Sequence, residues 1–168
     1  CINGHIEVAK WLLEIKPDIN INRIYDYTFA LSCAGGHLEV VKWLLNVIPN
    51  INISAHDDYA FKFTCGNGYL EVAKWLLNTK PDINISADYD SAFRWACLSG
   101  YLEVVKWLLE IKPDINISAV NDEAFRYICN YGHLNIANLL IHYIPYYNIK
   151  EFRTIRTIKI NLGLFDLI

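Results

Sequence analysis

Cysteine and histidine are the residues of this sequence best suited to hold a metal or to act in catalysis, and both recur at a fixed step. The five cysteines lie 32 residues apart, at Cys1, Cys33, Cys65, Cys97 and Cys129. His5, His37 and His133 each follow a glycine at this step, but Tyr69 and Tyr101 replace them in the other copies. A metal ligand or general base would not tolerate that exchange. The sequence also lacks a His-x-x-x-His pair, a phosphate-binding glycine loop and a nucleophile elbow. We therefore expect no enzyme, no cofactor and no metal.

The cysteines are better explained as core residues. Stacked helices lie about 8 to 10 Å apart, whereas a disulfide needs its two Cα atoms within about 7 Å. A free cysteine behaves as a small hydrophobic residue. We expect these thiols to be reduced and buried, which places the protein in an intracellular, reducing compartment.

Other residue types repeat at the same step of 32. Glycine recurs from Gly4 to Gly132, proline from Pro17 to Pro145 and tryptophan from Trp11 to Trp107. A period between 20 and 50 residues is typical of stacked units that cannot bury their apolar faces alone. The sequence therefore predicts an all-α repeat solenoid.

Each unit is predicted to contain two helices and a connection. In the second helix, Glu71, Lys74 and Asn78 form one narrow polar stripe, and the remaining positions are apolar. The first helix is marked by an aromatic residue and a small residue at i, i+4, and aspartates precede it as expected N-caps: Asp26, Asp58, Asp90 and Asp122. Lys80-Pro81 should end the second helix. The alternation in "DINIS" then predicts an extended loop or a short hairpin.

These words resemble the ankyrin repeat. The family's "GH-x-x-VV-x-x-LL" is matched by "GHLEVVKWLL" at 36–45, and its "GADVN" is similar to "KPDIN" at 80–84. The family's "TPLH" is replaced by "YAFK" at 59–62, "SAFR" at 91–94 and "EAFR" at 123–126, so the inter-repeat hydrogen bonds of that Thr and His are not expected here. The Ile-, Asn- and Tyr-rich repeats with "PDIN" look like those of ankyrin-repeat proteins from giant viruses that infect amoebae.

The resemblance divides the chain into ankyrin-like repeats over residues 1–149 and a remainder. The repeats are 1–22 (partial), 23–54, 55–86, 87–118 and 119–149, and 150–168 is interpreted as a degenerate, incomplete sixth repeat. Because the chain opens inside a repeat word and contains no Met, we expect it to be a segment of a longer protein.

Composition argues against two kinds of partner. A formal charge of −3 without a dense Lys/Arg run disfavours nucleic acid, and no apolar stretch approaches the ~18 residues of a membrane span. A viral origin would place the protein in the host cytoplasm or in the virion.

The repeated tryptophans allow two interpretations. Trp75 lies about 40° from Glu71 on the helical wheel, at the border of the polar stripe. The tryptophan column is therefore either packing between repeats or an apolar docking strip.

The copies differ most at the loop tips, which read "NRIY" (22–25), "SAHD" (54–57), "SADY" (86–89) and "SAVN" (118–121). In an ankyrin-like stack these tips and the first helices line one concave face. Its variation reflects either drift or recognition of another protein. The varied positions are rich in Tyr, His, Arg and Trp, which often carry interface energy. The predicted protein-binding residues are Tyr25, His56, Tyr59, Tyr89, Arg94, Trp95, Leu98, Arg126 and Tyr131.

We expect a non-catalytic scaffold or adaptor that binds another protein, of unknown identity, through this concave face. The alternative is a structural virion or assembly component that makes contacts through the tryptophan column and the stack ends. Self-association through exposed stack ends would favour that alternative.

Overall fold

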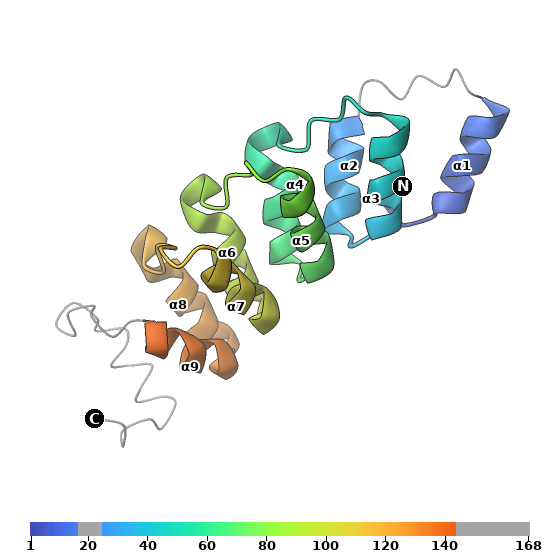
Figure 1. Cartoon of the computed structure of the whole chain (residues 1–168). Helices are drawn as coiled ribbons and strands as arrows, with labels where there is room; N and C mark the ends of the chain where they lie inside the picture. Colours follow the sequence, from blue (N-terminus) through green and yellow to red (C-terminus); the bar gives the residue numbers. More distant parts are fainter. Residues whose placement is uncertain (17–24, 144–168) are drawn as a thin grey trace.

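The structure is a computed structural model that describes residues 1–16 and 25–143. In these ranges it contains nine α-helices and no strand, and the helices stack side by side along one axis (Figure 1). The first helices of the repeats are α2 (Tyr25–Ala34), α4 (Ala55–Gly66), α6 (Ala87–Ser99) and α8 (Ala119–Tyr131). The second helices are α1 (Ile6–Ile15), α3 (Leu38–Val47), α5 (Leu70–Thr79), α7 (Leu102–Ile111) and α9 (Leu134–Tyr143). The predicted all-α repeat solenoid is confirmed.

The second helices have the predicted polar stripe and apolar remainder. In α5 the side chains of Val72, Ala73 and Leu76 are buried, whereas Glu71 is exposed and pairs with Lys74 at 3.6 Å. The helix ends at Thr79, one residue before Lys80-Pro81, as the proline predicts.

The first helices end at the periodic glycines. Gly68 has φ +82°, and the N–H of Tyr69 donates to the carbonyl of Thr64 at 3.1 Å, which satisfies a carbonyl at the end of α4. The same six-residue closure joins His37 to Ser32, Tyr101 to Ala96 and His133 to Ile128.

Packing between repeats involves mainly the first helices. Helix α4 lies against both α2 and α6, and α6 also lies against α8, with closer approach than between neighbouring second helices. Fully buried small residues such as Ala60, Cys65, Ala92 and Cys97 allow this approach. Because the spacing is closer on the first-helix side, the stack is concave on that side.

A single hydrophobic core runs through the described repeats. Its largest members are the phenylalanines of the first helices: Phe29, Phe61, Phe93 and Phe125. The predicted burial of the cysteines is confirmed for Cys33, Cys65 and Cys97, whereas Cys1 is half-buried. Cys129 lies in α8, but its side chain is outside the described residues.

The tryptophans of the internal second helices pack between repeats. Trp43, Trp75 and Trp107 are half-buried against the core. The ring of Trp107 lies 6.2 Å, centroid to centroid, from that of Phe61 in the preceding repeat. The structure thus supports the packing interpretation for these three residues.

The N-cap prediction for the aspartates was wrong about the hydrogen-bond partner. Asp58 Oδ2 accepts from the backbone N–H of Asn84 at 3.1 Å, so the carboxylate joins the start of α4 to the connection that follows α5 in the same repeat, instead of capping its own helix. Asp26 and Asp90 bind the backbone N–H of Asn52 (2.8 Å) and Asn116 (3.3 Å) in the same way.

The connection after each second helix forms turns rather than a hairpin in the described ranges. Asn84 Oδ1 accepts from the N–H of Ser86 at 3.1 Å, a local Asx-type bond that competes with strand pairing. The alternation still appears as burial, because Ile83 is buried and Asn84 is exposed.

Some expectations concern residues outside the described ranges. The tip word at 22–25 lies almost wholly there, and so does the proposed sixth repeat at 150–168. None of the described helices has the length and hydropathy to cross a bilayer.

Candidate functional site

Aromatic side chains from three adjacent first helices form a continuous series. Tyr27 on α2 lies 6.5 Å from Tyr59 on α4, Tyr59 stacks on Phe63 at 3.9 Å, and Phe63 lies 4.7 Å from Trp95 on α6, all measured between ring centroids. We call these four residues the aromatic stripe. It belongs to the concave, first-helix side of the stack, where the loop tips are also expected.

The aromatic stripe remains accessible to a partner. Tyr27 is 49% exposed, and the other three residues are half-buried. Burial, and to a smaller extent the neighbouring Tyr27, raises the pKa of Tyr59, so its hydroxyl stays a neutral hydrogen-bond donor. Half-exposed aromatic rings with a polar edge combine apolar area with hydrogen bonding, which suits them to protein recognition.

The packing of α6 on α4 fixes the position of Trp95. A β-carbon at Gly66 would lie 3.0 Å from the β-carbon of Trp95, so the glycine makes room for this close contact. The tryptophan ring is thereby held next to Phe63 instead of moving freely at the surface.

Two members of the aromatic stripe, Tyr27 and Phe63, were not among the predicted residues. Tyr27 and Tyr59 share one repeat position, and Phe63 and Trp95 share another, each pair 32 residues apart. The period therefore contained the signal, because side chains at equal positions of adjacent repeats are neighbours in a stack. Tyr127 continues the second position on α8, where its hydroxyl donates to Glu123 Oε1 at 2.6 Å.

Left-handed backbone occurs at the start of α4, α6 and α8, at three loop tips. Asp88, Tyr89 and Asp90 have φ between +54° and +58°, and residues 56–58 follow the same course at the start of α4. Non-glycine residues rarely adopt this conformation, which costs about 1 to 2 kcal/mol per residue. Strain of this kind is often found where a side chain serves binding. Here it presents Tyr89, which is 73% exposed.

Arg94 stabilises the left-handed turn from inside. Its Nε donates to the carbonyl of Tyr89 at 2.9 Å and its Nη2 to that of Asp88 at 3.0 Å, and the guanidinium forms an ion pair with Glu123 on α8. Because Arg94 is buried and its donors are used within the stack, its place is structural, unlike that of an accessible binding residue.

The remaining predicted residues occupy different environments. His56, Arg126 and Tyr131 are exposed. Leu98 is half-buried, and its carbonyl lies 2.9 Å from His133 Nε2, whose ring is near that of Tyr131. Tyr25 begins α2, but its side chain is outside the described residues. The structure thus brings Tyr59 and Trp95 into the aromatic stripe, places His56 and Tyr89 at the tips, and leaves Tyr131 and Arg126 at the α8 end.

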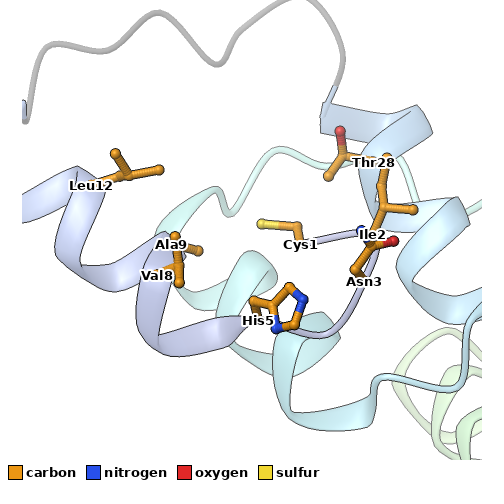
Figure 2. A pocket seen from close by; sticks show the side chains of 8 residues that line it. All are labelled: Cys1, Ile2, Asn3, His5, Val8, Ala9, Leu12 and Thr28. Atoms are coloured by element: carbon orange, nitrogen blue, oxygen red, sulfur yellow. The ribbon is translucent and has the colours of Figure 1, made fainter.

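A second apolar surface lies at the first unit, where α1 has no preceding first helix in the described residues. Trp11 is 57% and Leu12 44% exposed, whereas their counterparts in the internal repeats are half-buried or buried. A hollow of about 380 Å³ opens beside α1 and is lined by Cys1, Ile2, Asn3, His5, Val8, Ala9, Leu12 and Thr28 (Figure 2).

Among the described residues, no group of three or more His, Cys, Asp or Glu side chains could hold a metal ion. Burial raises the pKa of the Cys33, Cys65 and Cys97 thiols far above the ordinary value, so these side chains stay uncharged near neutral pH.

Comparison with known families gives a match over most of the chain. A model for three copies of the ankyrin repeat matches residues 29–121 and 60–151, and a model for many copies matches residues 1–45. A comparison with curated proteins found no match.

Proposed function

Since the chain belongs to the ankyrin-repeat family, whose repeats generally bind other proteins, we propose that it is a non-catalytic scaffold or adaptor acting through its concave face. The observation that carries the proposal is the aromatic stripe: Tyr27, Tyr59, Phe63 and Trp95 in consecutive ring contact across three repeats. A partner segment that follows the stack can contact all of these rings at once.

The tips extend this surface. Tyr89 and His56 stand at the left-handed turns that lead into α6 and α4, the helices that carry most of the aromatic stripe. Of the predicted set we keep His56, Tyr59, Tyr89 and Trp95 as the binding residues, add Tyr27 and Phe63, and assign Arg94 to the interior. Arg126, Leu98 and Tyr131 would form the continuation of the surface along α6 and α8.

Site-specific photocrosslinking tests the location of the surface. A benzoylphenylalanine at position 89 or 27 should form adducts with another protein in cells that express the chain, and these adducts should disappear when Trp95 is also replaced by Ala. The probe at position 74, on the exposed side of α5, serves as the matched control. Equal adducts from position 74, or adducts that do not depend on Trp95, would show that the concave face is not the binding site.

The apolar surface of α1 favours a second candidate function, that of an assembly component. Trp11, Leu12 and Ile15 are exposed there, and burying such a surface against a second copy would be favourable. Sedimentation equilibrium distinguishes the two candidates. An adaptor should remain monomeric, whereas an assembly component should associate with rising concentration and lose that property in Trp11→Glu/Ile15→Glu.

A further inference from the structure

Most acidic side chains of the second helices and connections form ion pairs, although the exposed Glu110 forms none among the described residues. On the second helices each of Glu7, Glu39, Glu71 and Glu103 is paired with the lysine three residues later. Asp82 and Asp114 in the connections are likewise paired with Lys80 and Lys112. These acidic groups therefore have their counter-charges within the chain.

The aspartates at the loop tips differ. Asp57 and Asp88 are exposed within the left-handed turns, and within residues 1–16 and 25–143 neither forms an ion pair. Within the described residues, the basic side chains on the same helices form no ion pair with these two aspartates. Lys62 is buried, and the guanidinium of Arg94 is paired with Glu123.

More carboxylates lie immediately below the tips. Asp58 and Asp90 are the last left-handed residues before the right-handed parts of α4 and α6, and they bind backbone N–H groups of the connection in their own repeat. These bonds orient the carboxylates but do not cancel their charge. The Oδ1 atom of Asp58 is buried and has no hydrogen-bond partner. The start of the concave face is thus acidic over at least two repeats.

From this combination we propose that the segment bound on the concave face is a basic peptide, with arginine as the preferred side chain. This inference rests on the proposed function and adds the chemistry of the partner. A guanidinium is planar and permanently charged, so it can stack on Tyr59, Phe63 or Trp95 while it pairs with a tip carboxylate. Lysine carries the same charge but stacks less well on the rings.

The spacing of the two acidic tips supports an elongated peptide. Asp57 and Asp88 belong to adjacent repeats, as do the rings of Phe63 and Trp95. Each repeat thus offers one carboxylate and at least one ring, and a segment with basic residues at intervals can use both repeats together. Simultaneous use of two such sites raises the overall affinity without new kinds of contact.

Selection from a library of random dodecapeptides, displayed on phage, tests both the proposed function and the basic-peptide inference. We expect the immobilised protein to enrich peptides with several arginines, and Tyr59→Ala/Trp95→Ala to fail to retain them. Enriched peptides that need the stripe but are neutral or acidic would overturn the basic-peptide inference and leave the proposed function standing. Enriched peptides whose retention does not depend on the stripe would count against the proposed function itself.

A synthetic copy of an enriched peptide then tests the tip carboxylates. Asp57→Asn/Asp88→Asn should weaken its binding about three- to tenfold, and asparagine is tolerated in the left-handed conformation of these positions. Glu71→Gln/Glu103→Gln removes the same two charges from the outer helices and should leave binding nearly unchanged. Equal effects of the two double variants, or equal binding of a lysine-for-arginine peptide, would overturn the assignment of the site or of the preferred side chain, respectively. Isothermal titration calorimetry provides the dissociation constants.

Discussion

The ring of Tyr101 occupies the space that a β-carbon of residue 68 would need. A β-carbon built on Gly68 would lie 2.4 Å from Tyr101 Cδ1, and the backbone there has φ +82°. Glycine is therefore needed at this position for two reasons. The turn that ends α4 needs a left-handed residue, and the aromatic ring of the next repeat leaves no room for a β-carbon. Tyr69 on Gly36 and His37 on Gly4 repeat the relationship, which explains why histidine and tyrosine exchange at this position.

Gly68→Ala should destabilise the protein by more than about 3 kcal/mol, because the left-handed backbone costs about 1 to 2 kcal/mol and the tyrosine ring must also move. Gly132→Ala is the matched control, since Gly132 has φ +72° but no atom of the described residues lies within 4 Å of its added β-carbon. It should lose only the backbone contribution. Urea unfolding measures both changes, and equal losses would mean that the ring contact does not limit this position.

Asp58→Ala should lower the free energy of unfolding by about 1 to 3 kcal/mol, because the backbone N–H of Asn84 in the connection after α5 loses its acceptor. Asp58→Asn retains a carbonyl oxygen and tolerates the left-handed backbone, so most of the stability should remain. Hydrogen exchange at the Asn84 amide reports the bond directly. Unchanged protection of this amide in Asp58→Ala would show that the bond to Asp58 does not protect it.

The contrast between these aspartates and the glycines shows what the sequence could predict. The 32-residue period determines the helices, their ends and the buried phenylalanines, because local preference and hydrophobic pattern agree there. The period also shows that aspartate recurs at the position of Asp58 in the other repeats. The direction of its hydrogen bond depends on the left-handed turn at residues 56–58. His and Asp adopt this conformation more readily than most residues, but normally as single residues, so local propensity does not indicate three in succession.

The candidate site was predictable in part for a similar reason. Tyr59 and Trp95 were expected at the surface because aromatic residues stood at variable positions. Arg94 was expected there by the same criterion, but its guanidinium binds two carbonyls of the turn and the carboxylate of Glu123 inside the stack. Burial of a long polar side chain depends on partners from another repeat, and variability alone does not reveal them.

Arg94→Ala is expected to destabilise the protein by about 2 to 4 kcal/mol, because Glu123 and two carbonyls of the left-handed turn lose their partner. Arg126→Ala, at the equivalent and exposed position of the next repeat, should change stability by less than about 0.5 kcal/mol. Thermal unfolding followed by circular dichroism compares the two. Similar losses would show that Arg94 contributes no more than a surface charge.

The thiols of Cys33, Cys65 and Cys97 should resist modification by Ellman's reagent in the native protein, because they are buried and their raised pKa keeps them protonated. Raising the pH from 7 to 9 should not make them reactive, since this range lies below their native pKa. Half-buried Cys1 should react first. Mass mapping of the labelled sites checks the order, and rapid native labelling of Cys65 would contradict it.

The last prediction compares one leucine position in two repeats. Leu76 on α5 is fully buried in the core, whereas its counterpart Leu12 on α1 is 44% exposed. Leu76→Ala should cost about 2 to 5 kcal/mol, because it loses buried apolar area and leaves a cavity. Leu12→Ala should cost less than about 1 kcal/mol, because its side chain is already partly in water.

In a linear stack each repeat is stabilised by its neighbours, so α1 should also exchange its amides faster than α5. Urea unfolding combined with hydrogen exchange measures both effects. Equal costs at the two leucines, or equally slow exchange in α1 and α5, would show that the exposed face of α1 is covered in solution, as self-association through this stack end would require.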